Sequence, residues 1–271
     1  MASLPLFSSS PWHTCHAFRS VSFPTRSHQS ILLVEEELKH IKAWETSMSS
    51  SSSSPDAEAF CKGLTCLERL YTYVDNLLNS HVTQQSLSHY QHQKLLDELL
   101  VRSIKLLDIC GSIKDVVSQV KEHVRDIQSA QRRRKEDITI DASLLMKLKK
   151  NAKKVVTELK QISHIYCSKL LDVDGHIASV IAVVRDVSEI SILVFEMLLG
   201  FMSLFISKLK STSKKFMVLK WIQKGSSGNK NHHQICVEGL DFHVEGIENV
   251  LGSVFRRLIS TRASLLNIQS N

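Results

Sequence analysis

The chain has 271 residues, of which 43% are hydrophobic and 23% are charged. This composition is ordinary for a globular protein and excludes a chain that is disordered over its whole length. The formal net charge of +7 indicates a basic surface, but the excess is too small to predict a nucleic-acid partner. All four prolines lie within the first 55 residues, which favours long helices in the remainder.

Residues 1–30 contain no acid and are rich in serine, threonine and proline. A segment of this composition cannot bury a core, so we expect a disordered tail. The same composition is typical of an organelle transit peptide, which leaves plastid import as an alternative. Because the segment has no long apolar run, we do not expect a secretory signal.

The next two segments carry apolar residues at helical spacing. The first stripe, spaced 3-4-3, places four residues on one helical face. A run of serines at 49–54 then breaks the pattern, and Pro55 and Asp56 offer a helix start. The second stripe is spaced 4-3-4-3-4 and is about five turns long. The two stripes are Ile31, Val34, Leu38 and Ile41, followed by Phe60, Leu64, Leu67, Tyr71, Val74 and Leu78.

A third helical region is predicted to begin near Gln84 and to run through Leu95, Leu96, Leu99 and Leu100. Beyond these leucines the same face is kept by Ile109, Ile113, Val116, Val120, Val124 and Ile127. Gly111 lies inside this pattern. Because glycine costs about 1 kcal/mol relative to alanine in a helix, we expect the helix either to continue past Gly111 on this face or to kink or break there.

Three further helical segments follow. The fourth has an apolar stripe from Leu145 to Ile162, opposite a face rich in lysine. The basic residues at 132–154 predict a solvated helix face, with a nuclear-import signal and a phosphate-binding face as alternatives. The fifth segment covers 173–209, and a glycine- and serine-rich linker follows at 225–229. The last stripe runs from Leu240 to Ile268.

These stripes predict an all-α fold, because no segment shows sustained alternation with a period of two. Repeated 3-4 spacing indicates an elongated antiparallel helical bundle with coiled-coil-like seams. We therefore expect the disordered tail at 1–30 to precede one bundle domain at 31–271. Flexible breaks are expected within that domain near 47–55 and 225–234.

Seven stretches of the chain carry a family resemblance. They are 19–28 (RSVSFPTRSH), 34–38 (VEEEL), 106–111 (LLDICG), 121–124 (KEHV), 127–130 (IQSA), 255–259 (FRRLI) and 261–268 (TRASLLNI). In this order they resemble the plant-specific BYPASS-like family, whose biochemical activity is unknown. The resemblance implies a plant protein linked to root and shoot development, and it implies no catalytic residues.

The N-terminal tail contains a candidate modification site. Arg19 lies three residues before Ser22, and Ser20 lies between Arg19 and Ser22. Pro24 lies two residues after Ser22. This pattern is typical of a basophilic kinase site whose phosphorylated form docks in an arginine-lined groove of a phosphopeptide-binding adaptor such as a 14-3-3 protein. We expect phosphorylation and partner docking at these four residues. The alternative is a serine-rich tail that matches by chance.

The apolar run at 190–206 is a second candidate. Only Glu196 interrupts it, and lysines follow at once. The run is shorter than the roughly 20 residues of a membrane span and contains an acid, which favours the most buried helix of the bundle. The alternative is a peripheral or single-span membrane anchor. The candidate contacts for a membrane are Ile190, Phe195, Leu199, Phe201, Phe205, Lys208 and Lys210.

Signals for metal, nucleotide and catalytic sites are weak. His89 and His92 lack further ligands, and the acidic stretch at 172–175 fails the spacing of a calcium loop. Asp97 and Glu98 are interpreted as residues of a helix surface. We therefore expect no cofactor, no metal and no enzymatic activity.

The sequence thus predicts a non-enzymatic scaffold or adaptor whose partners are other proteins. Its six scattered cysteines form no C-x-x-C pair and indicate reduced thiols in an intracellular protein. The expected location is the cytoplasm, with membrane association and the plastid as alternatives. The sequence does not define the oligomeric state.

Overall fold

The computed structural model describes residues 29–50, 57–89, 92–133, 146–147, 150–151, 153–158, 175–222 and 234–270. For 130–132, 207–222 and 234–243 the description covers the backbone alone. Every regular element within these ranges is a helix. The all-α prediction is confirmed.

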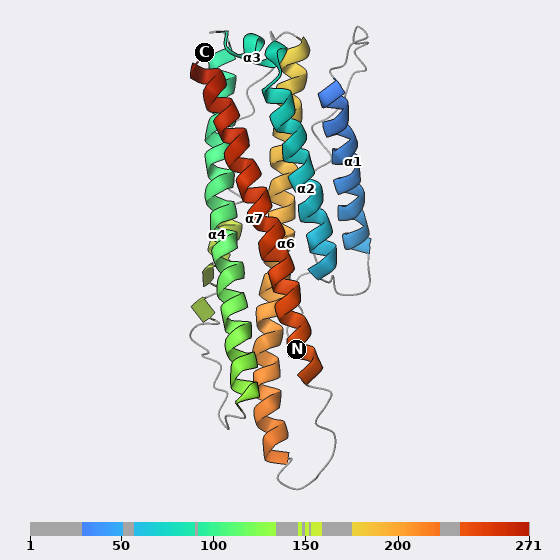
Figure 1. The fold of residues 1–271 in the computed structure, drawn as a ribbon, viewed down its shortest axis with the longest axis vertical. Coiled ribbons are helices and arrows are strands. Elements are labelled where there is room, and N and C mark those ends of the chain that lie inside the picture. Colours follow the sequence, from blue (N-terminus) through green and yellow to red (C-terminus); the bar gives the residue numbers. More distant parts are fainter. Residues whose placement is uncertain are drawn as a thin grey trace.

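Four long helices lie side by side and form an elongated bundle (Figure 1). They are α2 (Ala57–Leu78), α4 (Gln93–Arg132), α6 (Gly175–Ile222) and α7 (Gln234–Ser270). Helices α2 and α7 run one way and α4 and α6 the other, so the bundle is antiparallel as predicted. Helix α7 packs against both α2 and α4.

Two shorter helices complete the described fold. Helix α3 (His81–Leu87) crosses one end of the bundle, where Ser80 caps it by accepting a hydrogen bond from the Thr83 amide at 3.3 Å. Helix α1 (Gln29–Ser50) lies along the outside of the bundle and packs on α2 and α6. Helix α1 therefore lies alongside the four long helices of the core.

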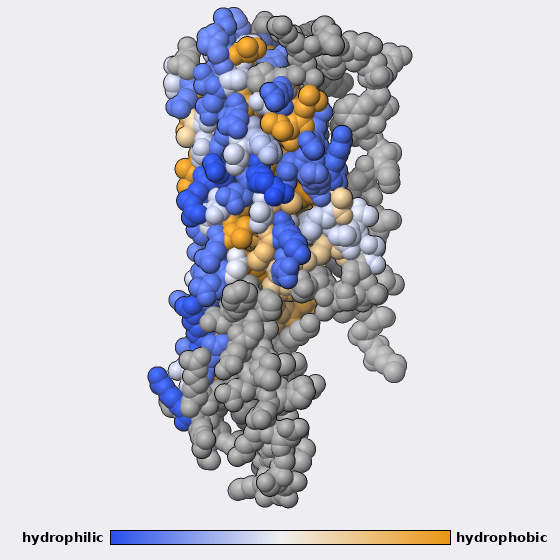
Figure 2. Space-filling model, turned by 45° about the vertical axis from the view of Figure 1, so that its right-hand side comes forward, coloured by the Kyte–Doolittle hydropathy of each residue, from blue (hydrophilic) through white to orange (hydrophobic). Residues whose placement is uncertain are grey.

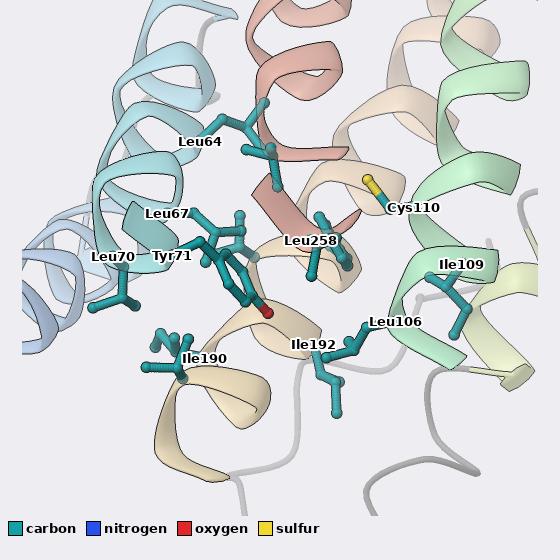
Figure 3. Close-up of a cluster of buried hydrophobic side chains, with 14 of the residues drawn as sticks. Leu64, Leu67, Leu70, Tyr71, Leu106, Ile109, Cys110, Ile190, Ile192 and Leu258 are labelled. Atoms are coloured by element: carbon teal, nitrogen blue, oxygen red, sulfur yellow. The ribbon is translucent and has the colours of Figure 1, made fainter. Parts of the chain in front are cut away.

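The predicted apolar stripes form the core. Every side chain of the first two stripes is buried, as are the stripe residues of α4 and the α7 positions from Val244 onward. In Figure 3, Tyr71 of α2, Leu106 of α4, Ile192 of α6 and Leu258 of α7 lie around one shared interior. Each fully buried aliphatic side chain contributes about 1.5–3 kcal/mol, so these seams hold the helices together. On the face shown in Figure 2, the coloured surface is mostly hydrophilic, with separate hydrophobic patches.

The predicted third region is divided in two. Helix α3 ends at Leu87 and α4 begins only at Gln93, so a helix beginning near Gln84 and continuing into α4 is wrong. Residues 88–92 have no apolar periodicity in the sequence, and Ser88 and His89 form a turn after α3. His92, just before α4, is buried, and its Nδ1 donates to the Ser86 carbonyl at 2.8 Å, which ties the start of α4 to the end of α3.

Of the two possibilities at Gly111, continuation is observed, because α4 runs through Gly111 to Arg132. Apolar residues on both sides of Gly111 are buried, and their burial outweighs a cost of about 1 kcal/mol for one glycine. Helix α1 likewise continues to Ser50, beyond the expected break near residue 47, and 51–56 lie outside the described residues.

Several predicted features lie outside the described residues. They include the tail at 1–28, most of the basic strip at 132–154, the calcium-like stretch at 172–174 and the linker at 225–229. Of the predicted fourth stripe, Val155 is described and is buried. Helix α7 begins at Gln234, six residues before the predicted stripe.

Candidate functional site

The docking of α1 on the bundle is the arrangement with the most specific geometry. At its C-terminal half, the indole of Trp44 lies directly over Gly63 of α2, and a Cβ at Gly63 would overlap the ring. The indole Nε1 donates a hydrogen bond to the Ala59 carbonyl at 2.8 Å. Glycine is required at this position because the ring occupies the space of a side chain.

An aromatic series continues from this contact into the core. The Trp44 ring meets Phe60 edge-on, with centroids 6.3 Å apart and planes at 77°. Phe60 in turn lies 4.7 Å from Phe201 of α6, and Phe201 lies 6.1 Å from Phe205. Such aromatic pairs contribute about 0.5–1.5 kcal/mol beyond their buried area. The series therefore joins α1, α2 and α6 into one unit.

A charged contact fixes the middle of α1. Arg69 of α2 donates to Oε1 of the buried Glu37 from Nε at 3.1 Å and from Nη2 at 2.8 Å. The hydrogen bond to Glu37 raises the pKa of Arg69, so this guanidinium stays charged. Arg69 Nη2 also lies 3.3 Å from the Cys66 sulfur. Burial nevertheless raises the pKa of the Cys66 thiol, which disfavours a nucleophilic thiolate there.

Helices α4 and α6 are joined by a buried ion pair. Arg185 donates to Glu98 from Nε at 3.1 Å and from Nη2 at 2.9 Å. The interpretation of Glu98 as a surface residue is therefore wrong, whereas Asp97 is exposed and accepts a hydrogen bond from Gln269. An arginine 87 residues away satisfies the Glu98 carboxylate, and no local sequence pattern reveals such a partner.

Helices α2 and α7 meet through polar side chains. The buried Asp75 accepts a hydrogen bond from the Thr261 hydroxyl at 2.6 Å, and the Asn79 amide donates to Ser264 at 3.1 Å. Burial raises the pKa of Asp75, and its hydrogen bonds lower it only in part. A carboxyl with a raised pKa inside a helix seam is a titratable contact between α2 and α7.

The predicted docking residues Arg19, Ser20, Ser22 and Pro24 lie outside the described residues. The predicted membrane contacts are mostly in the core: Ile190, Phe195, Leu199 and Phe205 are buried, and Phe201 is half-buried. The side chains of Lys208 and Lys210 are not among those described. The structure therefore packs most of the apolar run inside the bundle, whereas Leu204 is exposed.

Among the residues that the structure describes, one segment, Gly175–Ile206, is long and apolar enough to cross a membrane by length and composition alone. The core helix of a soluble protein meets the same criterion. Tyr71 contacts this segment directly, because its hydroxyl lies 2.8 Å from Ser191 Oγ within the core. Ser191 in turn donates to the Val187 carbonyl at 2.6 Å. These buried polar contacts indicate a packed core helix.

The contact of Gly63 with Trp44 and the ion pairs of Glu37 and Glu98 were not predicted from the sequence. A lone glycine in a helical pattern was the available signal at Gly63, since it often marks a close packing contact. Within the described part of the chain, no three His, Cys, Asp or Glu side chains gather in a way that could hold a metal ion.

A family model described as Protein BPS1 matches residues 63–268. The matched segment starts at the glycine beneath Trp44 and ends near the C-terminus of α7, so it spans the four-helix core and leaves α1 outside. No curated protein and no solved structure matches the chain.

Proposed function

The chain belongs to the Protein BPS1 family, and we propose that it is a non-enzymatic helical scaffold that presents its N-terminal tail to partner proteins. The resemblance to the BYPASS-like family is confirmed by this match, and membership fits a plant developmental protein. The link to root and shoot development and the protein-binding role are parts of the proposal.

The observation that supports the scaffold role is the fixed position of α1. Trp44 over Gly63 and Glu37 on Arg69 hold this helix against the core at two points. The candidate motif ends at Pro24, only five residues before α1 begins at Gln29. A partner that binds the motif would therefore be held close to a rigid, elongated body.

Phosphorylation supplies the proposed control. A phosphate on Ser22 adds about −1.5 to −2 charges to a tail whose strong bases are Arg19 and Arg26. The phosphate offers oxygens that an arginine-lined groove binds through charge-assisted hydrogen bonds. The proposed partner is a phosphopeptide-binding adaptor, and the proposed compartment is the cytoplasm.

Proximity labelling in plant cells tests the proposal, with the label inserted internally so that both ends stay free. The wild-type chain is compared with Ser22→Ala and with Ser9→Ala, a matched change in the same tail outside the motif. We expect phosphate on Ser22, and partners that are lost in Ser22→Ala but kept in Ser9→Ala. Identical partner sets for all three chains would contradict the tail-docking role. A defined catalytic turnover that is lost on changing a buried residue would contradict the scaffold role.

The runner-up is a membrane protein anchored through 190–206. The apolar composition of Gly175–Ile206 supports it. Insertion would, however, withdraw Phe195 and Leu199 from the core and separate Tyr71 from Ser191. We therefore place this alternative second. Cell fractionation decides between the two, because an anchored chain stays in the membrane pellet until detergent is added.

A further inference from the structure

The outer side of the seam between α4 and α7 carries four exposed hydrophobic side chains. Val101 and Ile104 of α4 are 43% and 40% exposed, and Ile259 and Leu266 of α7 are 46% and 41% exposed. Each pair lies on one side of its helix, because residues three or seven apart share a face. We call this set the seam strip.

Contacts between the two helices fix their relative heights. Gln269 donates to Asp97 at 2.8 Å, and Arg262 donates to the Leu100 carbonyl at 2.8 Å. Farther along, Lys114 lies 4.5 Å from the centre of the Phe255 ring. The helices are antiparallel. Counting from Gln269 and Asp97, Val101 is level with Leu266 to within one residue, and Ile104 is level with Ile259 to within about three residues.

Opposite charges lie on the two helices of the strip. Between Asp97 and Asp115 the exposed charged side chains of α4 are all acids, namely Asp97, Asp108 and Asp115, and they share the face that carries Val101 and Ile104. On α7, Arg256 is exposed beside Ile259. Counting from Gln269 and Asp97, Asp108 and Arg256 lie within about two residues, or about 3 Å, of the same height. The exposed charge of the strip is therefore acidic on α4 and basic on α7.

We propose that the seam strip binds the seam strip of a second copy of this chain. A twofold axis parallel to the helices places α4 of each copy against α7 of its partner. Ile104 then faces the partner's Ile259, Val101 faces the partner's Leu266, and Asp108 faces the partner's Arg256. Both apolar pairs and the charged pair occur twice, as an isologous interface requires.

A second copy fits this surface better than a lipid. Anionic headgroups repel the acids of α4, and a partner with charge of one sign satisfies only one of the two helices. The strip from Asp97 to Asp115 is about 27 Å long, which is short for a stable dimer. The dimer is accordingly weak and depends on concentration, and it does not rest on the scaffold role proposed above.

Sedimentation velocity on the full-length chain, from about 1 to 200 μM, tests the proposal. We expect the mass to rise from 30.6 kDa toward twice that value with concentration. Asp108→Arg places two positive charges together and shifts the dissociation constant upward by tenfold or more. Combining Asp108→Arg with Arg256→Asp restores the opposite charges in both copies of the pair, so dimerisation returns.

Leu32→Glu is the matched control, because Leu32 is an exposed hydrophobic residue on α1, away from the strip. It leaves the dissociation constant unchanged, whereas Ile104→Glu abolishes the dimer. Circular dichroism on each variant shows that the helices are retained. A monomer at every concentration overturns the proposal. A dimer that ignores Asp108→Arg and Ile104→Glu also overturns it, because that dimer uses another surface.

Discussion

The guanidinium of Arg185 holds the carboxylate of Glu98 by two parallel hydrogen bonds, of 3.1 and 2.9 Å. Only 11% and 4% of the two side chains are exposed, so neither charge is well hydrated. The pair joins α6 to α4, and Arg185 lies five residues before the apolar run at 190–206 begins. A buried pair of this kind sets which residues of two helices face each other, beyond what interchangeable aliphatic side chains specify.

Removing one partner of this pair should be far more harmful than removing both. Arg185→Met leaves a buried carboxylate without its cation, and we expect a loss of about 3–5 kcal/mol in the free energy of unfolding. Combining Glu98→Leu with Arg185→Met should recover most of that loss, since neither charge remains. Urea denaturation measures both changes. Lys62→Met is the control: its pair with Glu58 is largely exposed, so we expect a change below about 0.5 kcal/mol. Additive losses in the double variant would show that the two residues do not act as a pair.

Two glycines should respond oppositely to alanine. Gly63→Ala places a methyl group inside the Trp44 ring, and overpacking of this kind costs about 1–3 kcal/mol. Gly111→Ala places a methyl group 3.8 Å from Phe255, an ordinary contact, and gains up to about 1 kcal/mol of helix propensity. Thermal unfolding measures the two stabilities, and hydrogen exchange should show faster exchange across α1 in Gly63→Ala alone. Equal effects at both sites would contradict the packing of Trp44 on Gly63.

The stability contributed by Asp75 should depend on pH. Its folded-state pKa lies above the unfolded value of about 3.9, because burial disfavours the charge. The folded protein then binds the proton more tightly, so stability is greatest below the unfolded pKa and falls as pH rises through the folded pKa. Asp75→Asn abolishes this titration and still accepts from Thr261. We expect the variant to gain stability relative to wild type between about pH 4 and pH 7, as measured by urea denaturation at both values. A difference that stays constant with pH would refute the burial of a charge here.

Cys110 should be protected from alkylation in the folded protein. It is fully buried on α4, and burial raises the pKa of its thiol to about 12. Only opening of the bundle exposes it as a reactive thiolate. With iodoacetamide at pH 8, we expect Cys110 to react about 100-fold or more slowly than in urea. The half-buried Cys61 and Cys66 serve as internal comparisons. Peptide mass spectrometry reads each site, and equal rates at Cys110 in the two states would contradict the closed core.

Apolar periodicity could predict which side chains form the core, because a residue buried against a neighbouring helix must recur every three or four positions. Phe60, Leu67 and Val254 are buried for this reason. Pairs between helices distant in the sequence could not be predicted in this way. The carboxylates of Glu98 and Glu37 have the local pattern of surface residues, and only the fold supplies Arg185 and Arg69.

The candidate site was less predictable than the core. Gly63 has no side chain whose period could be counted, and the ring that requires it comes from Trp44, nineteen residues earlier. Where α3 and α4 separate, His92 donates a hydrogen bond to the backbone carbonyl of Ser86, a contact that helix propensities do not predict. The tail motif at 19–24 stays a prediction from sequence, since it lies outside the described residues.

We propose that the apolar run at 190–206 packs inside the helical bundle and that other molecules bind to the outer surfaces of the protein. Hydrogen–deuterium exchange of the purified full-length chain without detergent tests it directly, with and without vesicles of phosphatidylcholine and phosphatidylserine. We expect the backbone amides of 190–206 to be among the slowest in the chain, comparable to those of α7 near Leu258, and to be unchanged by vesicles. Rapid exchange in 190–206 that becomes slow only when vesicles are added would contradict the closed bundle and favour the membrane anchor.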